Sequence, residues 1–302
     1  MNERVRNLLL LHVIVLIFGF TGIIGKLVTV NAERMVFWRA SIAAVALGLF
    51  LLFYRKRSPI PLKDLARHAA IGLLTAAHWI TFFAAIKASN VSVALATIAS
   101  TALFVSFFEP IILKKRFDWR ESFLGIAVIA GLCIIFSVET RFMTGIVLAL
   151  ISAALAGLFS TLNAREVKRF SPISISFNEM VFASLFTGAY LFFTGQMNAD
   201  TFSMSRQDWL YLILLGTIAT AFAFVISVEV LKALSPFTVA LTINLEPVYS
   251  ILIALLLFPE TEVMNGWFYL GAAIILGALV VDAYLKKRNS NPKEIGSDTV
   301  TH

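Results

Sequence analysis

The chain has 302 residues, of which 59% are apolar and 14% charged, against roughly 45–50% and about 25% in an average soluble domain. This number of charged residues is too small to cover the surface of a water-soluble protein of this length. The composition therefore excludes a soluble domain and indicates a chain surrounded by lipid. The net charge of +7 does not indicate a nucleic-acid partner, because most Lys and Arg residues lie in loops between apolar segments.

Apolar segments recur along the chain without the alternating polarity of a membrane β-strand. Segments of this length cross the roughly 30 Å hydrocarbon layer as helices, which also pair every backbone N–H and C=O group in lipid. We therefore predict an all-α integral membrane protein with ten transmembrane helices. In chain order they span residues 8–25, 35–54, 67–86, 91–113, 119–138, 144–163, 174–194, 208–231, 237–258 and 266–285. The first segment follows basic residues as a signal peptide does, but no small-x-small cleavage site follows it, so we keep it as a helix.

The two halves of the chain repeat one pattern at a separation of 146 residues. Gly125 and Gly131 recur as Gly271 and Gly277, and seven further identities link positions 89–131 with positions 235–277. Because each half has five helices, the second half enters the membrane from the side opposite to the first. We predict two inverted five-helix repeats, residues 1–142 and 143–285, and a polar cytoplasmic tail over residues 286–302 that we expect to be unfolded.

The basic residues predict the orientation in the membrane. With the N-terminus in the cytoplasm, 19 of the 25 Lys and Arg residues fall on the cytoplasmic side of the ten-helix topology, as the positive-inside rule requires. A miscount of one helix would exchange the sides of all later loops, so this distribution also supports the count. We therefore predict a protein of the cell (inner) membrane with both termini in the cytoplasm.

Several loose patterns over residues 8–285 resemble the drug/metabolite transporter superfamily, in particular its EamA-type exporters. They are the Phe37-x-Arg39 start of the second helix, the Glu246-Pro247 pair with Glu260 at the end of the same helix, and the recurring glycine pairs. The resemblance implies a secondary transporter that exports small metabolites, with amino acids prominent among the substrates. It also implies a central cavity lined by both halves. Inverted repeats themselves suit alternating access, because exchanging the shapes of the halves opens the protein to the other side.

Glu246 is the first candidate for a substrate-binding or proton-coupling residue. An ionised carboxylate near the bilayer centre costs at least about 2.5 kcal/mol, so such a residue normally faces a partner or a wet cavity. Pro247 strengthens this interpretation, since it donates no N–H and leaves a carbonyl of the preceding turn without its helical partner. The first half has Thr101 in place of Pro247. Tyr249 shares the helix face of Glu246, whereas Asn244 shares it only if Pro247 kinks the helix. The alternative is a protonated structural glutamate bonded to a neighbouring helix.

The third predicted helix carries a polar and aromatic face at mid-span. His78 and Phe82 lie one turn apart, with Thr75 one turn before them and Trp79 beside them. A polar face in a lipid-surrounded helix turns inward, so these residues either contact the substrate or pack against the fourth helix. His12 and His78 make no recognisable metal site, and we predict neither a metal nor a cofactor.

Other charges within the predicted helices have structural interpretations. We expect Arg39 and Glu179, each about one turn inside a helix end, to reach the membrane interface or to pair with a loop, with gating ion pairs as the alternative. Glu229 and Lys232 have the spacing of an ion pair on one helix face. Glu109 has no basic residue on its own face, so we expect it to pair with another helix.

Two small-xxx-small patterns occur at matching places in the halves, Ala127-xxx-Gly131 and Ala273-xxx-Gly277. Such patterns let helix backbones approach closely in lipid. We expect them to serve packing of the fifth and tenth helices within the chain, and a homodimer interface stays open as the alternative.

The class of function has two further alternatives. An intramembrane enzyme acting on a lipid or peptide would need a nucleophile and base, or a metal cluster, within mutual reach, and the chain has no motif of either kind. We therefore predict no catalytic residues. A structural membrane protein is disfavoured by the duplication and by Glu246. The predicted partners are a small-molecule substrate and membrane lipid.

Overall fold

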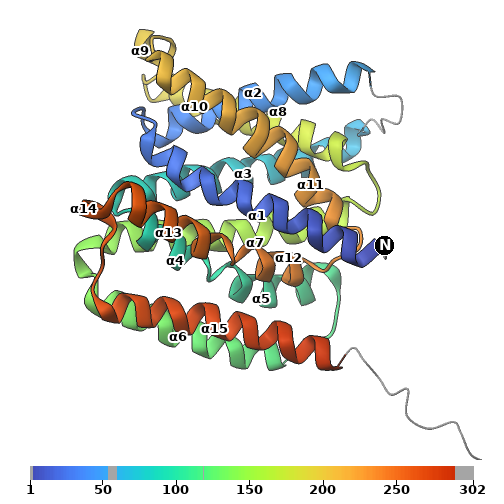
Figure 1. Cartoon of the computed structure of the whole chain (residues 1–302). Helices are drawn as coiled ribbons and strands as arrows, with labels where there is room; N and C mark the ends of the chain where they lie inside the picture. The colour runs from blue at the N-terminus through green and yellow to red at the C-terminus, as the bar shows by residue number, and fades with distance from the viewer. Residues whose placement is uncertain (1–2, 54–59, 118, 290–302) are drawn as a thin grey trace, which may run out of the picture.

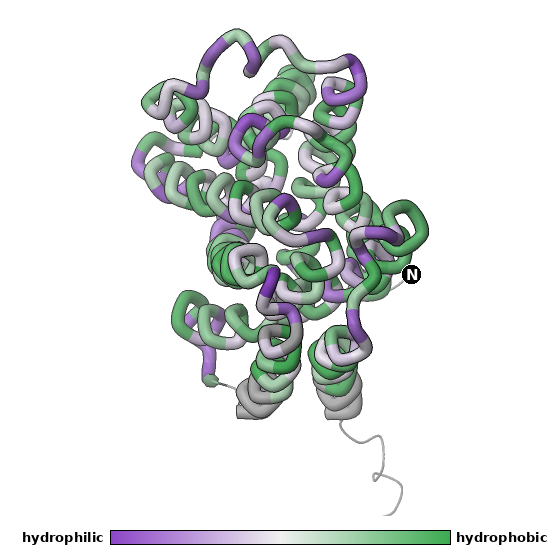
Figure 2. Tube along the Cα trace, turned by 90° about the vertical axis from the view of Figure 1, so that its left-hand side faces the viewer, coloured by the Kyte–Doolittle hydropathy of each residue, from purple (hydrophilic) through white to green (hydrophobic). Residues whose placement is uncertain are grey.

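The computed structural model describes residues 3–53, 60–117 and 119–289, and every regular element within these ranges is a helix. The helices run side by side along one direction (Figure 1), and hydrophobic residues predominate along them (Figure 2). The elements of the first half are α1 (Glu3–Leu27), α2 (Ala32–Phe53), α3 (Leu62–Ala88), α4 (Val91–Ile98), α5 (Thr101–Leu113) and α6 (Trp119–Val138). Those of the second half follow the short turn η1 (Thr140–Phe142): α7 (Met143–Glu166), α8 (Pro172–Phe193), α9 (Ala199–Phe202), α10 (Arg206–Gly216), η2 (Thr217–Phe222), α11 (Ala223–Val230), α12 (Pro236–Ile243), α13 (Glu246–Leu257), α14 (Pro259–Glu262) and α15 (Gly266–Asn289).

Eight helical segments of the described ranges are long and apolar enough to cross a membrane. They are α1, α2, α3, α4–α5, α7, α8, α10–α11 and α12–α13, which match the first four predicted spans and the sixth to ninth. The chain is therefore an all-helical integral membrane protein. Helices α6 and α15 occupy the places of the fifth and tenth spans, and neither belongs to these eight segments. The count of ten stays a prediction.

The helices pack in a pattern that stays the same when the two halves are exchanged. Helix α3 packs against α7 and α8, and its counterpart α10–α11 packs against α1 and α2. Helices α4 and α5 pack on α7 as α12 and α13 pack on α1, while α2 packs on α8 and α6 on α15. Each half therefore buries its apolar faces mainly against the other half.

The chain direction of the two halves is opposite. Lys26 at the end of α1 bonds Glu262 just before α15, and Gly145 at the start of α7 lies against Ser89 at the end of α3. The start of α7 thus lies at the end of the bundle where α1 finishes, opposite to the end where α1 begins (Figure 1). This is the arrangement of inverted repeats.

The fourth and ninth predicted spans are broken at the same level. Helix α4 ends at Ile98 and α5 begins at Thr101, and α12 ends at Ile243 and α13 begins at Glu246. Pro247 accounts for the second break, because it lacks an N–H. The predicted span over residues 91–113 is confirmed, but its helix is interrupted at residues 99–100, where no proline lies. There the Thr101 hydroxyl donates to the Ile98 carbonyl at 2.7 Å, which gives this carbonyl a side-chain partner at the break.

A carboxylate from the second half caps the start of α4. Glu262 accepts hydrogen bonds from the backbone N–H groups of Val91 at 3.1 Å and Ser92 at 2.8 Å. Its side chain is fully buried and also receives the ammonium of Lys26 at 2.7 Å. The first N–H groups of a helix have no partner within it, so Glu262 satisfies donors that lipid could not.

The start of α12 is capped in the same way from the first half. Glu109 on α5 accepts a hydrogen bond from the Phe237 backbone N–H at 3.0 Å and pairs with Lys115 at 2.5 Å. The expectation that Glu109 pairs with another helix is confirmed. Each half therefore supplies the carboxylate that completes the broken helix of the other.

Glycines allow close contact between α6 and α15. A Cβ atom on Gly131 would lie 2.7 Å from the Gly271 carbonyl oxygen, and one on Gly271 would lie 2.8 Å from that of Gly131. The expected packing role of Gly131 is confirmed. For Gly277 it is wrong, since nothing lies within 4 Å of an added Cβ. Six residues after Gly271, Gly277 lies on a different face of α15.

We expected an unfolded tail from residue 286. Helix α15 instead continues to Asn289, so this expectation is wrong for residues 286–289. Residues 290–302 lie outside the described ranges, as do the basic residues of segment 54–59.

Gly131→Ala should destabilise the protein by about 1–3 kcal/mol, since the methyl group has no room against the α15 backbone. The matched control is Gly277→Ala, which makes the same chemical change in open space and should leave stability unaltered. Thermal unfolding of the purified variants in detergent measures both. Equal loss in the two variants would contradict the packing described for α6 and α15.

Candidate functional site

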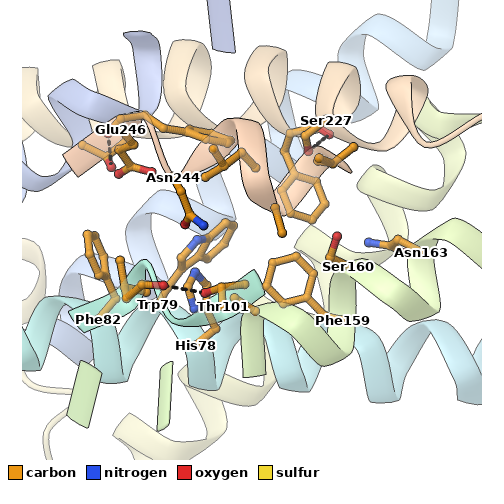
Figure 3. Close-up of a pocket in the computed structure, with 18 of the residues that line it drawn as sticks. His78, Trp79, Phe82, Thr101, Phe159, Ser160, Asn163, Ser227, Asn244 and Glu246 are labelled. Atoms are coloured by element: carbon orange, nitrogen blue, oxygen red, sulfur yellow. Dashed lines mark hydrogen bonds between the residues drawn. The ribbon is translucent and has the colours of Figure 1, made fainter. Parts of the chain in front are cut away.

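A cavity of about 130 Å³ lies between the two halves, at the level of the helix breaks (Figure 3). Its walls come from α1, α2, α3 and the α4–α5 break on one side, and from α7, α11 and the α12–α13 break on the other. One buried water molecule needs roughly 10–15 Å³ of such cavity volume. The pocket therefore has room for several water molecules or for a small ligand.

A carboxyl group and a guanidinium group face this pocket without forming an ion pair. Glu246 is the first residue of α13 and is 8% exposed, and Arg39 on α2 is 3% exposed. Both line the cavity, and their charges interact electrostatically. The Glu246 carboxylate has no hydrogen bond or ion pair with any side chain in the part of the chain that the structure describes. A buried charge without a direct partner is costly, so the pair is suited to a ligand or to water between the two groups.

Arg39 is held in place by the irregular helix opposite. Its Nε donates to the Thr220 hydroxyl at 2.6 Å, and Nη2 donates to the Ala219 carbonyl at 3.3 Å. Both acceptors belong to the π-helical segment η2, a type of irregularity that is frequent at functional sites. The guanidinium also lies 4.2 Å from the centre of the Trp79 ring. The expectation that Arg39 reaches the interface is wrong, because polar and aromatic partners inside the bundle hold it.

The break before α13 turns Asn244 toward the pocket. Asn244 lines the cavity beside Glu246 and Pro247, and its buried Nδ2 has no hydrogen-bond partner among the described residues. Tyr249 does not line the pocket: it is 38% exposed and lies against Gly19 of α1. Both Glu246 and Tyr249 belong to α13, but three residues on a helix leave an offset of about 60° around its axis, and Tyr249 lies on the α1 side.

The rest of the wall is largely aromatic. His78, Trp79 and Phe82 line the pocket from α3, and Phe159 and Phe224 line it from the second half. The ring centres of Trp79 and Phe224 are 6.0 Å apart, and those of His78 and Phe159 are 5.4 Å apart.

His78 is also fixed to a neighbouring helix. Its Nδ1 lies 2.8 Å from the Ser152 hydroxyl of α7. This part of the α3 face therefore packs on α7, and not on the fourth helix, which was the packing partner that we expected.

Six of the seven predicted site residues thus lie around one pocket: His78, Trp79, Phe82, Asn244, Glu246 and Pro247. Their role in binding or coupling stays a prediction.

Sequence reasoning missed the pocket residues of α11, although the duplication contained a signal for them. The separation of 146 residues carries His78 onto Phe224 and Phe82 onto Val228, and all four line the pocket.

An all-helical membrane protein whose inverted repeats enclose a pocket of charged and aromatic residues has the architecture of a transporter. The model of the EamA-like transporter family matches the chain twice, over residues 6–137 and 143–282. The chain belongs to this family of the drug/metabolite transporter superfamily and is a membrane transporter.

One similar protein carries a transporter name, and one solved structure shares the fold. YxxF of Bacillus subtilis (strain 168), named as an uncharacterized transporter, is 23% identical over 251 residues, covering 78% of this chain and 77% of YxxF. A solved structure described only as "Crystal structure of protein" is similar in fold, with a TM-score of 0.68, 16% identity, and coverage of 96% of this chain and 100% of that chain. These comparisons point to a transporter rather than to an intramembrane enzyme.

The pocket should be reached by water, which a thiol probe can test in a Cys133→Ser background. We expect Ser227→Cys, in the pocket wall, to react with a small water-soluble methanethiosulfonate at least about tenfold faster than Leu252→Cys, because only a hydrated thiol forms the reactive thiolate. Leu252 is exposed on the outside of α13, where lipid surrounds it. Equal rates at the two positions would contradict a hydrated pocket.

Proposed function

We propose that the protein is a secondary transporter that exports small metabolites, amino acids among them, across the cell membrane by alternating access. The observation that carries the proposal is the central pocket in which Glu246 and Arg39 face each other without an ion pair. This arrangement offers one site for a positive group and one for a negative group, within a mainly aromatic wall.

An amino acid matches this distribution of groups. Its ammonium group suits the Glu246 carboxylate, and its carboxylate suits the Arg39 guanidinium, of whose five N–H donors two bond Thr220 and Ala219. Asn244 offers an unpaired amide N–H₂ beside them. Trp79 and Phe82 present apolar ring surface for the remainder of the substrate. Amino acids are also the substrates that the family resemblance suggested.

The two caps support alternating access. Glu262 with Lys26 holds one end of the bundle, and Glu109 with Lys115 holds the other. In the proposed cycle, one cap opens while the other stays closed, which exposes the pocket to one side at a time. Each cap joins a carboxylate of one half to the start of a broken helix of the other half, so opening either end of the bundle breaks one such contact between the halves.

Orientation and direction are further parts of the proposal. The excess of basic residues on one side supports a location in the cell membrane with both termini in the cytoplasm, and export follows the resemblance to EamA-type exporters. Glu246 is proposed to couple transport to protons, since a carboxyl group that lines a cavity inside the bundle can exchange a proton for the ammonium group of the substrate.

Glu246→Gln should lower amino acid counterflow in proteoliposomes by about tenfold or more and remove its dependence on a pH gradient. The estimate follows from the roughly 1.5–3 kcal/mol that a hydrogen bond to a charged group contributes. The matched control is Glu229→Gln. Glu229 pairs with Lys232 at 2.9 Å, as predicted, but this ion pair is exposed and lies away from the pocket. Wild-type rates and pH dependence in Glu246→Gln would contradict the role given to this carboxylate. If the wild-type protein transports none of the twenty amino acids, the proposed substrate class is wrong.

A further inference from the structure

A second buried cluster of polar groups begins at the pocket wall and leads away from Glu246. Asn163 on α7 lines the pocket (Figure 3), and its Nδ2 donates to Glu179 Oε2 on α8 at 3.1 Å. Glu179 is 0% exposed. The prediction that this carboxylate reaches the membrane interface is therefore wrong, and its contact with the pocket is through one amide.

The Asn163–Glu179 contact leaves an acceptor without a partner on each side chain. Neither Asn163 Oδ1 nor Glu179 Oε1 has a hydrogen-bond partner among the described residues. An amide offers an N–H to a carboxylate and, when turned over, a carbonyl oxygen to a carboxylic acid. Asn163 can thus bond Glu179 in both protonation states. The two acceptors are therefore open to a proton or to a water molecule.

Further titratable groups connect Glu179 with the end of the bundle where α3 begins. Glu166 lies one turn after Asn163 on α7 and interacts electrostatically with Glu179. Its Oε2 is 3.4 Å from His68 Nε2 and its Oε1 is 3.3 Å from Arg67 Nε. Both nitrogens of the fully buried His68 ring lack a hydrogen bond in the described part of the chain, whereas the Arg67 side chain is 41% exposed. The cluster therefore runs from the pocket to the surface.

Most other charged groups on the helices packed against α8 are engaged elsewhere, and the remaining two, Glu33 and Lys63, lie in the first turns of α2 and α3. Arg39 of α2 bonds Thr220, Lys87 at the far end of α3 bonds the Val28 carbonyl, and Glu229 of α11 pairs with Lys232. At the start of α3, Asp64 is paired with Arg67 and Arg169. At the start of α2, Arg34 bonds Asn198 and is far from Glu179 along the bundle. Among the described residues, Glu179 has no cationic side chain as an ion-pair partner.

We propose that Glu179 is a proton-binding site, distinct from Glu246, that exchanges its proton with the pocket through Asn163 and with the α3 start through Glu166 and His68. In the neutral form Glu179 donates its O–H to the Asn163 carbonyl oxygen. When the proton leaves to water in the pocket or to Glu166, the carboxylate accepts the Asn163 N–H. A use of this proton in transport rests on the proposed function, whereas proton binding by Glu179 does not.

Infrared difference spectroscopy over a pH titration tests the site on purified protein in lipid vesicles, with the proton itself as the ligand. The wild type should show the C=O stretching band of a buried carboxylic acid that disappears as the pH rises. Glu179→Gln should lose this band, and Asn163→Leu should shift it because the hydrogen bond is gone. Glu229→Gln, which changes an exposed carboxylate, should keep it.

Glu179→Asp serves as a second variant that keeps the acid, and it should retain the band at a shifted frequency even if Glu179→Gln folds poorly. A Glu179→Gln spectrum equal to that of the wild type, or loss of the whole band in Glu246→Gln alone, would overturn the proposal. Because no substrate is present, these outcomes are independent of whether the protein transports amino acids.

Discussion

Lipid offers no hydrogen bond to a backbone N–H group, and in this protein each half completes a broken helix of the other. Glu262 bonds the first N–H groups of α4, and Glu109 bonds that of α12. The two halves are therefore joined by charge-assisted hydrogen bonds at both ends, as well as by apolar packing. The same pairing holds the breaks of α4–α5 and α12–α13 at one level, and the pocket exists because these breaks meet between the halves.

The pocket gathers polar groups that the membrane would otherwise penalise. Glu246 begins α13, where helix N–H groups and the helix dipole favour a negative charge. Arg39 reaches the same cavity because η2 offers Thr220 and a free carbonyl, and Trp79 covers the guanidinium. On the other side, Asn163 links the cavity to Glu179. The cavity is thus connected to two carboxyl groups. Arg39 faces Glu246, and the Asn163 amide bonds Glu179. Two carboxyl groups with different surroundings could bind a proton and a charged substrate in the same transport cycle.

The sequence predicted the class of protein, the duplication and most of the pocket residues of α3 and α12–α13. Polar side chains inside long apolar segments are costly in lipid and therefore face the interior of the bundle. It placed Arg39 and Glu179 wrongly at the interface, since depth along a helix says nothing of partners on other helices. The partner of Arg39, Thr220, lies on a helix remote in the sequence, and that of Glu179, Asn163, lies on the preceding helix. Tyr249 was assigned to the pocket because it follows Glu246 by three residues on α13, but this spacing leaves an offset of about 60° around the helix, and the side chain lies against α1. These errors all concern tertiary contacts, which spacing along one helix does not encode.

The account depends most on the inversion of the two halves, and this requires α6 to cross the membrane. Single cysteines replacing Arg116, before α6, and Arg141, after it, can be labelled in a Cys133→Ser background with a membrane-impermeant maleimide. Both side chains are exposed in loops at the two ends of α6. We expect the Arg141→Cys variant to be labelled from outside intact cells and the Arg116→Cys variant only after the membrane is opened. Labelling of both positions from the same side would contradict the inverted arrangement and the two-sided pocket derived from it.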